Sequence, residues 1–188
     1  MKLLKTKDMA AKYRLQDFTQ IAGRNIFVDA NVLLYLFWPT GQHHFEQNYA
    51  RVFRNLLRQG NNLIVDFLVI SEIVNRAIKA EYEKHLLTYS LTKEQLNYKN
   101  YRNSQDGQDA LNDIYIIVKN DVLNYFRVIG KAYDRQDIES FLIVDELDFV
   151  DKATVSICAE NSLVLLTNDK DFKNSGLDIL TGNPIILS

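Results

Sequence analysis

The chain has 188 residues, of which 47% are hydrophobic and 24% charged, and its formal net charge is −2. These values are typical of a soluble globular protein with one well-buried core. Its single cysteine, Cys158, excludes a disulfide framework and a cysteine-rich zinc site, and it fits a reducing compartment. No apolar run approaches the ~18 residues of a membrane span, so we expect a cytoplasmic protein without a membrane partner.

The N-terminal segment is the most basic part of the chain. Residues 1–24 carry six Lys/Arg against two Asp, and we expect residues 1–25 to form a basic arm or helix. Residues 134–171 carry ten Asp/Glu against three Lys/Arg. This distribution suits a protein that contacts nucleic acid and holds cations, although a solvated surface explains it equally well. No Gly/Ser/Pro-rich linker follows, so residues 26–188 are predicted to be a single domain.

In chain order, buried strands alternate with helices. The strands are recognised as short apolar runs without polar alternation, and the helices by apolar residues at helical spacing. Gly60 is expected to stop the second helix, and Asp66 to cap the third. The predicted strands are 26–29 (IFVD), 62–66 (NLIVD), 162–169 (SLVLLTND) and 183–188 (NPIILS). The predicted helices are 31–38, 43–60, 67–87, one with apolar residues from Leu111 to Ile129, and one from about Asp148 through Cys158.

Such an order predicts an α/β fold with a mostly parallel sheet covered by helices on both faces. Four acidic residues then fall near one edge of that sheet, where the carboxyl ends of parallel strands meet the following helices. Asp29 ends the first strand, Asp169 follows the third, Glu72 lies early in the helix after the second, and Asp151 opens the helix before the third. Converging carboxylates repel one another unless they are protonated or a cation neutralises them, and hard divalent ions prefer oxygen ligands.

Each acid also has an ordinary structural explanation. Asp29 is placed to cap the next helix, and Glu72 is spaced to form an ion pair with Arg76. Asp148 and Asp151 resemble a capping box, and the fourth acid lies in a turn-like TNDKD. These explanations account for the acids one by one, but they leave unexplained why all four fall at one edge.

The sequence resembles the PIN-domain nucleases, which include the VapC-type toxins. The similarity covers roughly residues 25–188 and rests on FVDANVLLY, FLVISEIVNR and DFVDKATVSICAENSLVLLTNDKDF, with DILTGNPIIL resembling the last strand. It implies a three-layer α/β/α fold in which Asp29, Glu72, Asp151 and Asp169 are the catalytic, metal-binding acids. It further implies that Asn31 and Thr167 orient these acids and that Asp171 is an auxiliary acid. The long segment between Glu72 and Asp151 indicates a helical insertion over about 88–140.

By this resemblance the protein is expected to be a Mg²⁺- or Mn²⁺-dependent endoribonuclease. Its expected partners are RNA and, if it is a toxin, an antitoxin protein; a homodimer is also open. Basic residues that are candidates for phosphate contacts are Arg54, Arg58, Arg76 and Lys79. Two alternatives remain: a structure-specific nuclease acting on DNA with the same metal site, and a PIN-fold scaffold that binds RNA or protein without cutting.

Overall fold

A six-stranded sheet forms the centre of the protein in the computed structural model, which describes residues 10–38 and 43–188. Its strand order is β1-β6-β5-β2-β3-β4, and every neighbouring pair is parallel. The predicted α/β fold is therefore confirmed, with a sheet that is wholly rather than mostly parallel. The strands are β1 (Lys12–Arg14), β2 (Ile26–Val28), β3 (Leu63–Asp66), β4 (Phe126–Ile129), β5 (Val164–Leu166) and β6 (Ile179–Thr181).

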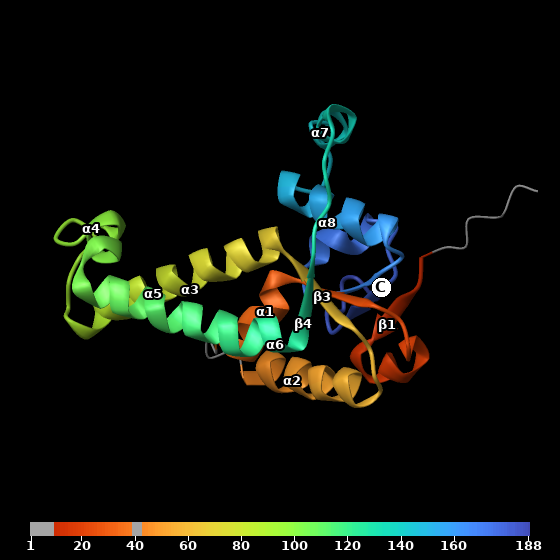
Figure 1. Ribbon diagram of the computed structural model, residues 1–188, viewed down its shortest axis with the longest axis horizontal. Helices are drawn as coiled ribbons and strands as arrows, with labels where there is room; N and C mark the ends of the chain where they lie inside the picture. The colour runs from red at the N-terminus through yellow and green to blue at the C-terminus, as the bar shows by residue number, and fades with distance from the viewer. Residues whose placement is uncertain (1–9, 39–42) are drawn as a thin grey trace, which may run out of the picture.

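The three central strands are almost entirely apolar because helices cover both faces of the sheet, and Asp66 at the end of β3 is the exception. Every residue of β2, β3 and β5 is buried, as expected for parallel strands packed on both sides. Helices α1 and α2 lie on one side of the sheet and α8 on the other (Figure 1). The helices are α1 (Ala30–Phe37), α2 (His43–Arg58), α3 (Phe67–Thr88), α4 (Tyr98–Asn103), α5 (Gln105–Ile117), α6 (Leu123–Tyr125), α7 (Arg135–Phe141) and α8 (Phe149–Glu160), with single-turn or irregular helices η1 (Leu15–Ile21), η2 (Val118–Val122) and η3 (Lys170–Asn174).

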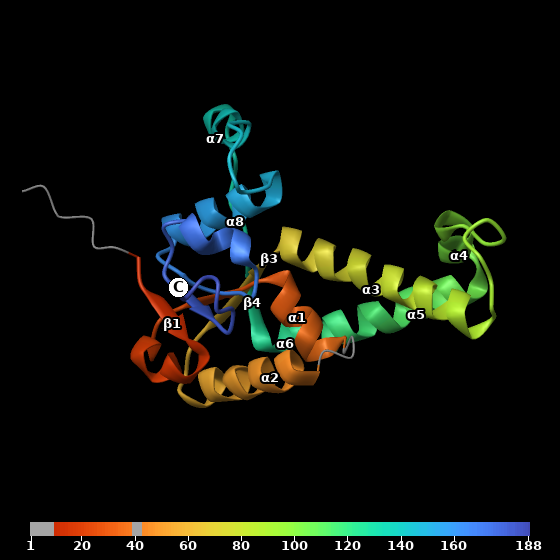
Figure 2. The same cartoon turned by 180° about the vertical axis from the view of Figure 1, so that it is seen from behind.

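Helices α3, α4 and α5 extend to one side of the sheet and form a helical lobe (Figures 1 and 2). The lobe has its own hydrophobic cluster, separate from the core around the sheet. That cluster contains Ala77, Ile78, Tyr82, Leu86, Tyr101, Leu111 and Ile114. Within the described residues no helix is both long and apolar enough to cross a membrane.

Two local signals seen in the sequence are confirmed. The Asp66 side chain caps α3 by accepting a hydrogen bond from the backbone N–H of Val69 at 2.8 Å. Helix α2 ends at Arg58, and Gly60 follows with a φ of +79°, a conformation that glycine adopts without steric cost. Both features depend only on residues close together in the chain.

Of the segment expected as a basic arm or helix, residues 10–25 contain a short strand and a 3-10 helix. Strand β1 joins the edge of the sheet beside β6, and η1 follows it. The carboxylate of Asp178 holds this segment, because it accepts a 2.7 Å hydrogen bond from the N–H of Ala11 and pairs with Arg24 at 2.7 Å. The first part of the expected arm, residues 1–9, lies outside the described residues.

Two expectations from the sequence are corrected. The apolar pattern predicted one helix as far as Ile129, but the helical part ends at Tyr125, and Phe126–Ile129 is the edge strand β4. The expected insertion over 88–140 therefore includes a strand of the sheet. In the C-terminal segment, the predicted strand 183–188 is a turn region, and the strand is instead Ile179–Thr181. That shift occurs because Ile179–Thr181 pairs with both β1 and β5.

Candidate metal centre

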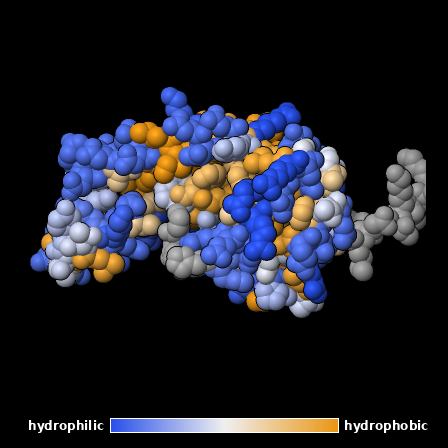
Figure 3. Space-filling model, turned by 90° about the horizontal axis from the view of Figure 1, so that it is seen from below, coloured by the Kyte–Doolittle hydropathy of each residue, from blue (hydrophilic) through white to orange (hydrophobic). Residues whose placement is uncertain are grey.

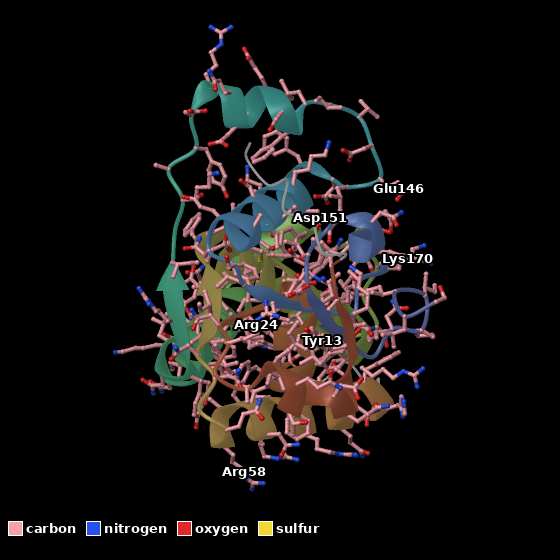
Figure 4. The ribbon with its side chains drawn as sticks, turned by 90° about the vertical axis from the view of Figure 1, so that its right-hand side faces the viewer. Tyr13, Arg24, Arg58, Glu146, Asp151 and Lys170 are labelled. Atoms are coloured by element: carbon pink, nitrogen blue, oxygen red, sulfur yellow. The ribbon has the colours of Figure 1, made fainter. Side chains whose placement is uncertain are left out.

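The four acids identified in the sequence line one small polar pocket. The pocket has a volume of about 130 Å³ and lies where β2 and β5 end and where α3 and α8 begin. Figure 4 shows Asp151 at this end of the molecule, above the sheet. Two further acids contribute: Asp171, expected as an auxiliary, and Asp148, which the sequence suggested only as a helix cap. The lining residues are Asp29, Asn31, Glu72, Arg76, Asp148, Val150, Asp151, Asp169 and Asp171.

Asp29 is held in one orientation by three hydrogen bonds. Its Oδ1 accepts from the backbone N–H of Ala30 at 2.7 Å. Its Oδ2 accepts from the Asn31 amide at 2.7 Å and from the Thr167 hydroxyl at 2.6 Å. The bond to Ala30 makes Asp29 the N-cap of α1, so the capping explanation holds as well. Because both carboxylate oxygens are engaged, the side chain is preorganised at the end of β2.

Thr167 and Asn31 connect the end of β2 to the end of β5. The hydroxyl of Thr167, which is fully buried, also accepts hydrogen bonds from the Asn31 amide at 3.3 Å and from the backbone N–H of Asp169 at 2.9 Å. The carbonyl of the Asn31 side chain accepts from the N–H of Asn168 at 3.2 Å. These contacts fix the loop that carries Asp169 against Asp29. The supporting role in catalysis that the resemblance implied for both residues stays a prediction.

Two of the acids in the pocket, Asp29 and Asp151, have raised pKa values. The pKa of Asp29 is raised to about 6: burial is the main cause and the charges of Glu72 and Asp169 add to it, while the hydrogen bonds from Thr167 and Ala30 lower it. Burial likewise raises the pKa of Asp151 to about 7, with added repulsion from Asp148, Asp29 and Asp169. Burial and the neighbouring carboxylates thus both disfavour the charged forms of Asp29 and Asp151.

Glu72 forms the ion pair that its spacing suggested. Its Oε1 lies 3.0 Å from Nη1 of Arg76, four residues later on α3, and both side chains are substantially exposed. An exposed pair of this kind contributes little to stability. Its consequence is local: one cation, Arg76, lines the acidic pocket beside the carboxylates.

The other basic candidates lie elsewhere. Lys79 lines a neighbouring groove between α1 and α3 rather than the acidic pocket. Arg54 and Arg58 are on the exposed side of α2, and Figure 4 shows Arg58 at the bottom of the view, well away from Asp151 in its upper half. Of the four basic residues singled out in the sequence, Arg76 alone lines the pocket.

The donor set suits a hard divalent cation, because every acidic side chain in the pocket offers oxygen. In the part of the chain that the structure describes, no three His, Cys, Asp or Glu side chains form a ready-made metal cluster. Mg²⁺ does not require one, since it binds through one or two protein carboxylates and keeps several waters. A cation would also relieve the repulsion that helps to raise the pKa values of Asp29 and Asp151. The residues present therefore fit Mg²⁺ or Mn²⁺.

The chain is similar to known proteins in sequence and in fold. Residues 26–176 match the PIN domain family. No curated protein sequence matches the chain. The crystal structure of PAE2754 from Pyrobaculum aerophilum is similar at 15% sequence identity and a TM-score of 0.47, covering 87% of this chain and 88% of that one. The crystal structure of VapBC2 from Rickettsia felis, bound to a DNA fragment from their promoter, is similar at 14% identity and a TM-score of 0.48, covering 83% and 97%.

Proposed function

Because the protein belongs to the PIN domain family, we propose that it is a metal-dependent endoribonuclease that hydrolyses phosphodiester bonds of RNA. The observation that supports this proposal is the pocket in which Asp29, Glu72, Asp151 and Asp169 meet at the carboxyl edge of the sheet. These four acids are the proposed ligands of Mg²⁺ or Mn²⁺. A bound divalent cation would supply an activated water and neutralise charge on the phosphate.

The side chains of the protein have separate tasks in this scheme. Asp29 offers a carboxylate whose orientation is set in advance by Asn31 and Thr167, so little reorganisation is needed on binding. The guanidinium of Arg76 lines the pocket and can donate hydrogen bonds to a phosphate oxygen there, with no movement of α3. Asp171 and Asp148 add negative charge at the rim, which favours cations over anions until a metal is bound.

Cleavage of single-stranded RNA tests the proposal directly. Purified protein should cleave RNA with Mg²⁺ or Mn²⁺ and not with EDTA, and the Asp151→Asn variant should be inactive. Asp113→Asn, an exposed acid in the helical lobe, is the charge-matched control and should cleave normally. Single-stranded and flap DNA belong in the same assay, because preferential cleavage of DNA would replace the RNA proposal with the DNA alternative. RNA binding without cleavage would favour the scaffold alternative.

Melting temperatures test the metal ligands independently of activity. In EDTA the Asp151→Asn protein should melt no lower than wild type, because one charge is removed from a crowded pocket. Mn²⁺ should raise the melting temperature of the wild type by mass action and that of the variant much less. A variant that keeps the full Mn²⁺ shift would remove Asp151 from the ligand set.

If the nuclease acts as a toxin, we expect an antitoxin protein that binds and inhibits it. If the protein is a toxin, its expression should arrest growth, the Asp151→Asn variant should not, and a small protein encoded next to it should relieve the arrest. Growth that is unaffected by the active enzyme would argue for an RNA-processing role without an antitoxin.

A further inference from the structure

We propose that a basic cleft beside α2 binds phosphates of the RNA strand that continues beyond the acidic pocket, an inference that rests on the proposed function. The cleft has a volume of about 710 Å³ and is formed by η1, α2 and the segment after β6. The residues that carry the argument are Arg14, Gln16, Asn48, Arg51, Asn55 and Gly182.

The charge of the cleft favours an anion. Two arginines, Arg14 and Arg51, line it, and no acidic residue does. Neither arginine forms an ion pair with any other described residue. Exposed guanidinium groups without an acidic partner are suited to phosphate, which they can bind through two parallel hydrogen bonds. The side-chain amides in the lining offer further donors.

Two other surface pockets contain acidic side chains beside their basic ones. The pocket beside His85 is lined by three acids, Glu81, Asp106 and Asp113, against a single lysine. The groove between α1 and α3 has cations, but Glu81 and Glu83 lie among them. A phosphate chain would be repelled from the first and only weakly attracted to the second, so neither competes with the cleft beside α2.

The basic character extends along α2 itself. Arg51, Arg54 and Arg58 follow one another at helical spacing, all three are exposed, and Asn55 lies between them. Seen from below, where α2 faces the viewer, strongly hydrophilic side chains form a band across this part of the surface (Figure 3). An RNA strand bound in the cleft could therefore contact further arginines along α2.

A hydrogen-bonded network joins the cleft to the acidic pocket. The hydroxyl of the buried Tyr49 donates to the carbonyl of Thr167 and lies 3.0 Å from the Asn168 side chain, while the N–H of Gly182 donates to it at 3.0 Å. The Asn183 amide donates to the carbonyl of Asn168 at 2.7 Å. The wall of the cleft is thus built on the same loop that carries Asp169, so the two sites are held at a fixed separation.

The strand order allows the distance between the cleft and the acidic pocket to be estimated. Arg14 pairs in register with Thr181, so the cleft adjoins the carboxyl ends of β1 and β6, whereas Asp29 ends β2. Since neighbouring strands are about 4.8 Å apart, two to three strand spacings correspond to about 10–15 Å. A few nucleotides of an extended single strand span such a distance, and the next phosphates would then lie over the arginines.

The cleft is a feature of this chain rather than of the matched family region. Arg14, Gln16 and Gly182 lie outside residues 26–176, and only α2 contributes from within them. The short strand β1, which the sequence pattern did not reveal, is what places Arg14 opposite Arg51.

RNA binding with matched arginine variants tests the inference. All proteins carry Asp151→Asn and are kept in EDTA, so that RNA is not cut. Fluorescence anisotropy with a labelled single-stranded RNA of about 20 nucleotides compares R14Q/R51Q with R102Q/R127Q, which removes two exposed arginines outside the cleft. We expect R14Q/R51Q to weaken binding about tenfold and to lower the salt slope by about 1.4, because each lost phosphate contact on a single strand contributes about 0.7. The control variant R102Q/R127Q should leave both the RNA affinity and the salt slope nearly unchanged.

Cleavage kinetics separate failure of the cleft from failure of the proposed function. In the otherwise wild-type protein with Mn²⁺, R14Q/R51Q should raise KM for the long RNA and leave kcat unchanged. An RNA of about three nucleotides, too short to reach the cleft, should be cut equally by both double variants. Equal binding of long RNA by R14Q/R51Q and R102Q/R127Q, including no binding by either, would overturn the inference. Absence of cleavage by the wild type would refute the endonuclease proposal, while the binding comparison would still decide the cleft.

Discussion

The hydroxyl of Thr167 donates a 2.6 Å hydrogen bond to Oδ2 of Asp29, and so joins the ends of two neighbouring strands, β5 and β2. The two residues are 138 positions apart in the chain. The same hydroxyl accepts from the N–H of Asp169. One buried oxygen atom therefore sets the positions of two carboxylates in the acidic pocket.

Replacing Thr167 with Val should loosen this arrangement at little change in size. The N–H of Asp169 loses its acceptor and Asp29 loses a donor, so we expect a loss of about 1–3 kcal/mol in the free energy of unfolding. RNA cleavage should fall as well, because Asp29 is no longer held in place. Urea unfolding and initial cleavage rates measure both effects. Thr167→Ser keeps the hydroxyl and should retain most activity; equal loss in the Ser and Val variants would show that packing matters rather than the hydrogen bond.

Glu72→Gln separates a metal ligand from a surface ion pair. Loss of the exposed pair with Arg76 should cost less than about 1 kcal/mol, whereas metal-dependent cleavage should fall at least tenfold. Glu81→Gln breaks a comparable pair with Lys84 on the same helix, outside the acidic pocket, and is the matched control. If both variants cut RNA at the wild-type rate, Glu72 is no more than an ion-pair partner.

Asp178 predicts a pH dependence for the attachment of β1. Burial raises the pKa of Asp178, but the hydrogen bonds from Ala11 and Arg24 outweigh burial, so this pKa lies below its usual value. An acid with a lowered pKa stabilises the folded state above its unfolded pKa and loses that contribution as pH falls through the folded pKa. Asp178→Asn should therefore lower stability by about 1 kcal/mol at pH 7, and the difference should shrink below about pH 4.

Chemical unfolding of wild type and Asp178→Asn at several pH values checks this prediction. Asp113→Asn, an exposed acid for which no ion pair is formed within the described residues, provides the baseline. A difference between wild type and Asp178→Asn that persists unchanged at pH 3 would show that the carboxylate charge is not what holds the segment.

Gly107→Ala should destabilise the helical lobe, although alanine normally favours a helix. A Cβ atom at Gly107 would lie 2.0 Å from the backbone oxygen of Tyr101, so α4 and α5 would have to separate. We expect a loss of about 1–3 kcal/mol, measured by thermal unfolding. Asn112→Ala, an exposed position on the same helix, should be neutral or slightly stabilising because of helix propensity. Stabilisation by Gly107→Ala would show that the close approach relaxes at no cost.

The sequence by itself determined the features that depend on neighbouring residues. The central strands β2, β3 and β5 could be recognised from their unbroken apolar runs, and Asp66 and Gly60 from their places at helix ends. Since strands of a parallel sheet end at one edge, the meeting of the four acids in one pocket could also be expected without coordinates. The family resemblance rested on the segments that contain these four acids, FVDANVLLY, FLVISEIVNR and DFVDKATVSICAENSLVLLTNDKDF.

Only the tertiary structure decided the edges of the sheet and the surface around the acidic pocket. Strand β1 is three residues of mixed polarity, and it exists because Asp178 and β6, more than 160 positions away, supply its hydrogen bonds. Strand β4 continues the apolar spacing of a helix and becomes a strand because β3 offers a free edge. The same long-range pairing brings Arg14 to Arg51 in one cleft and leaves Arg58 far from the acids. Periodicity reports which residues are buried, but contacts between distant segments decide which polar side chains meet.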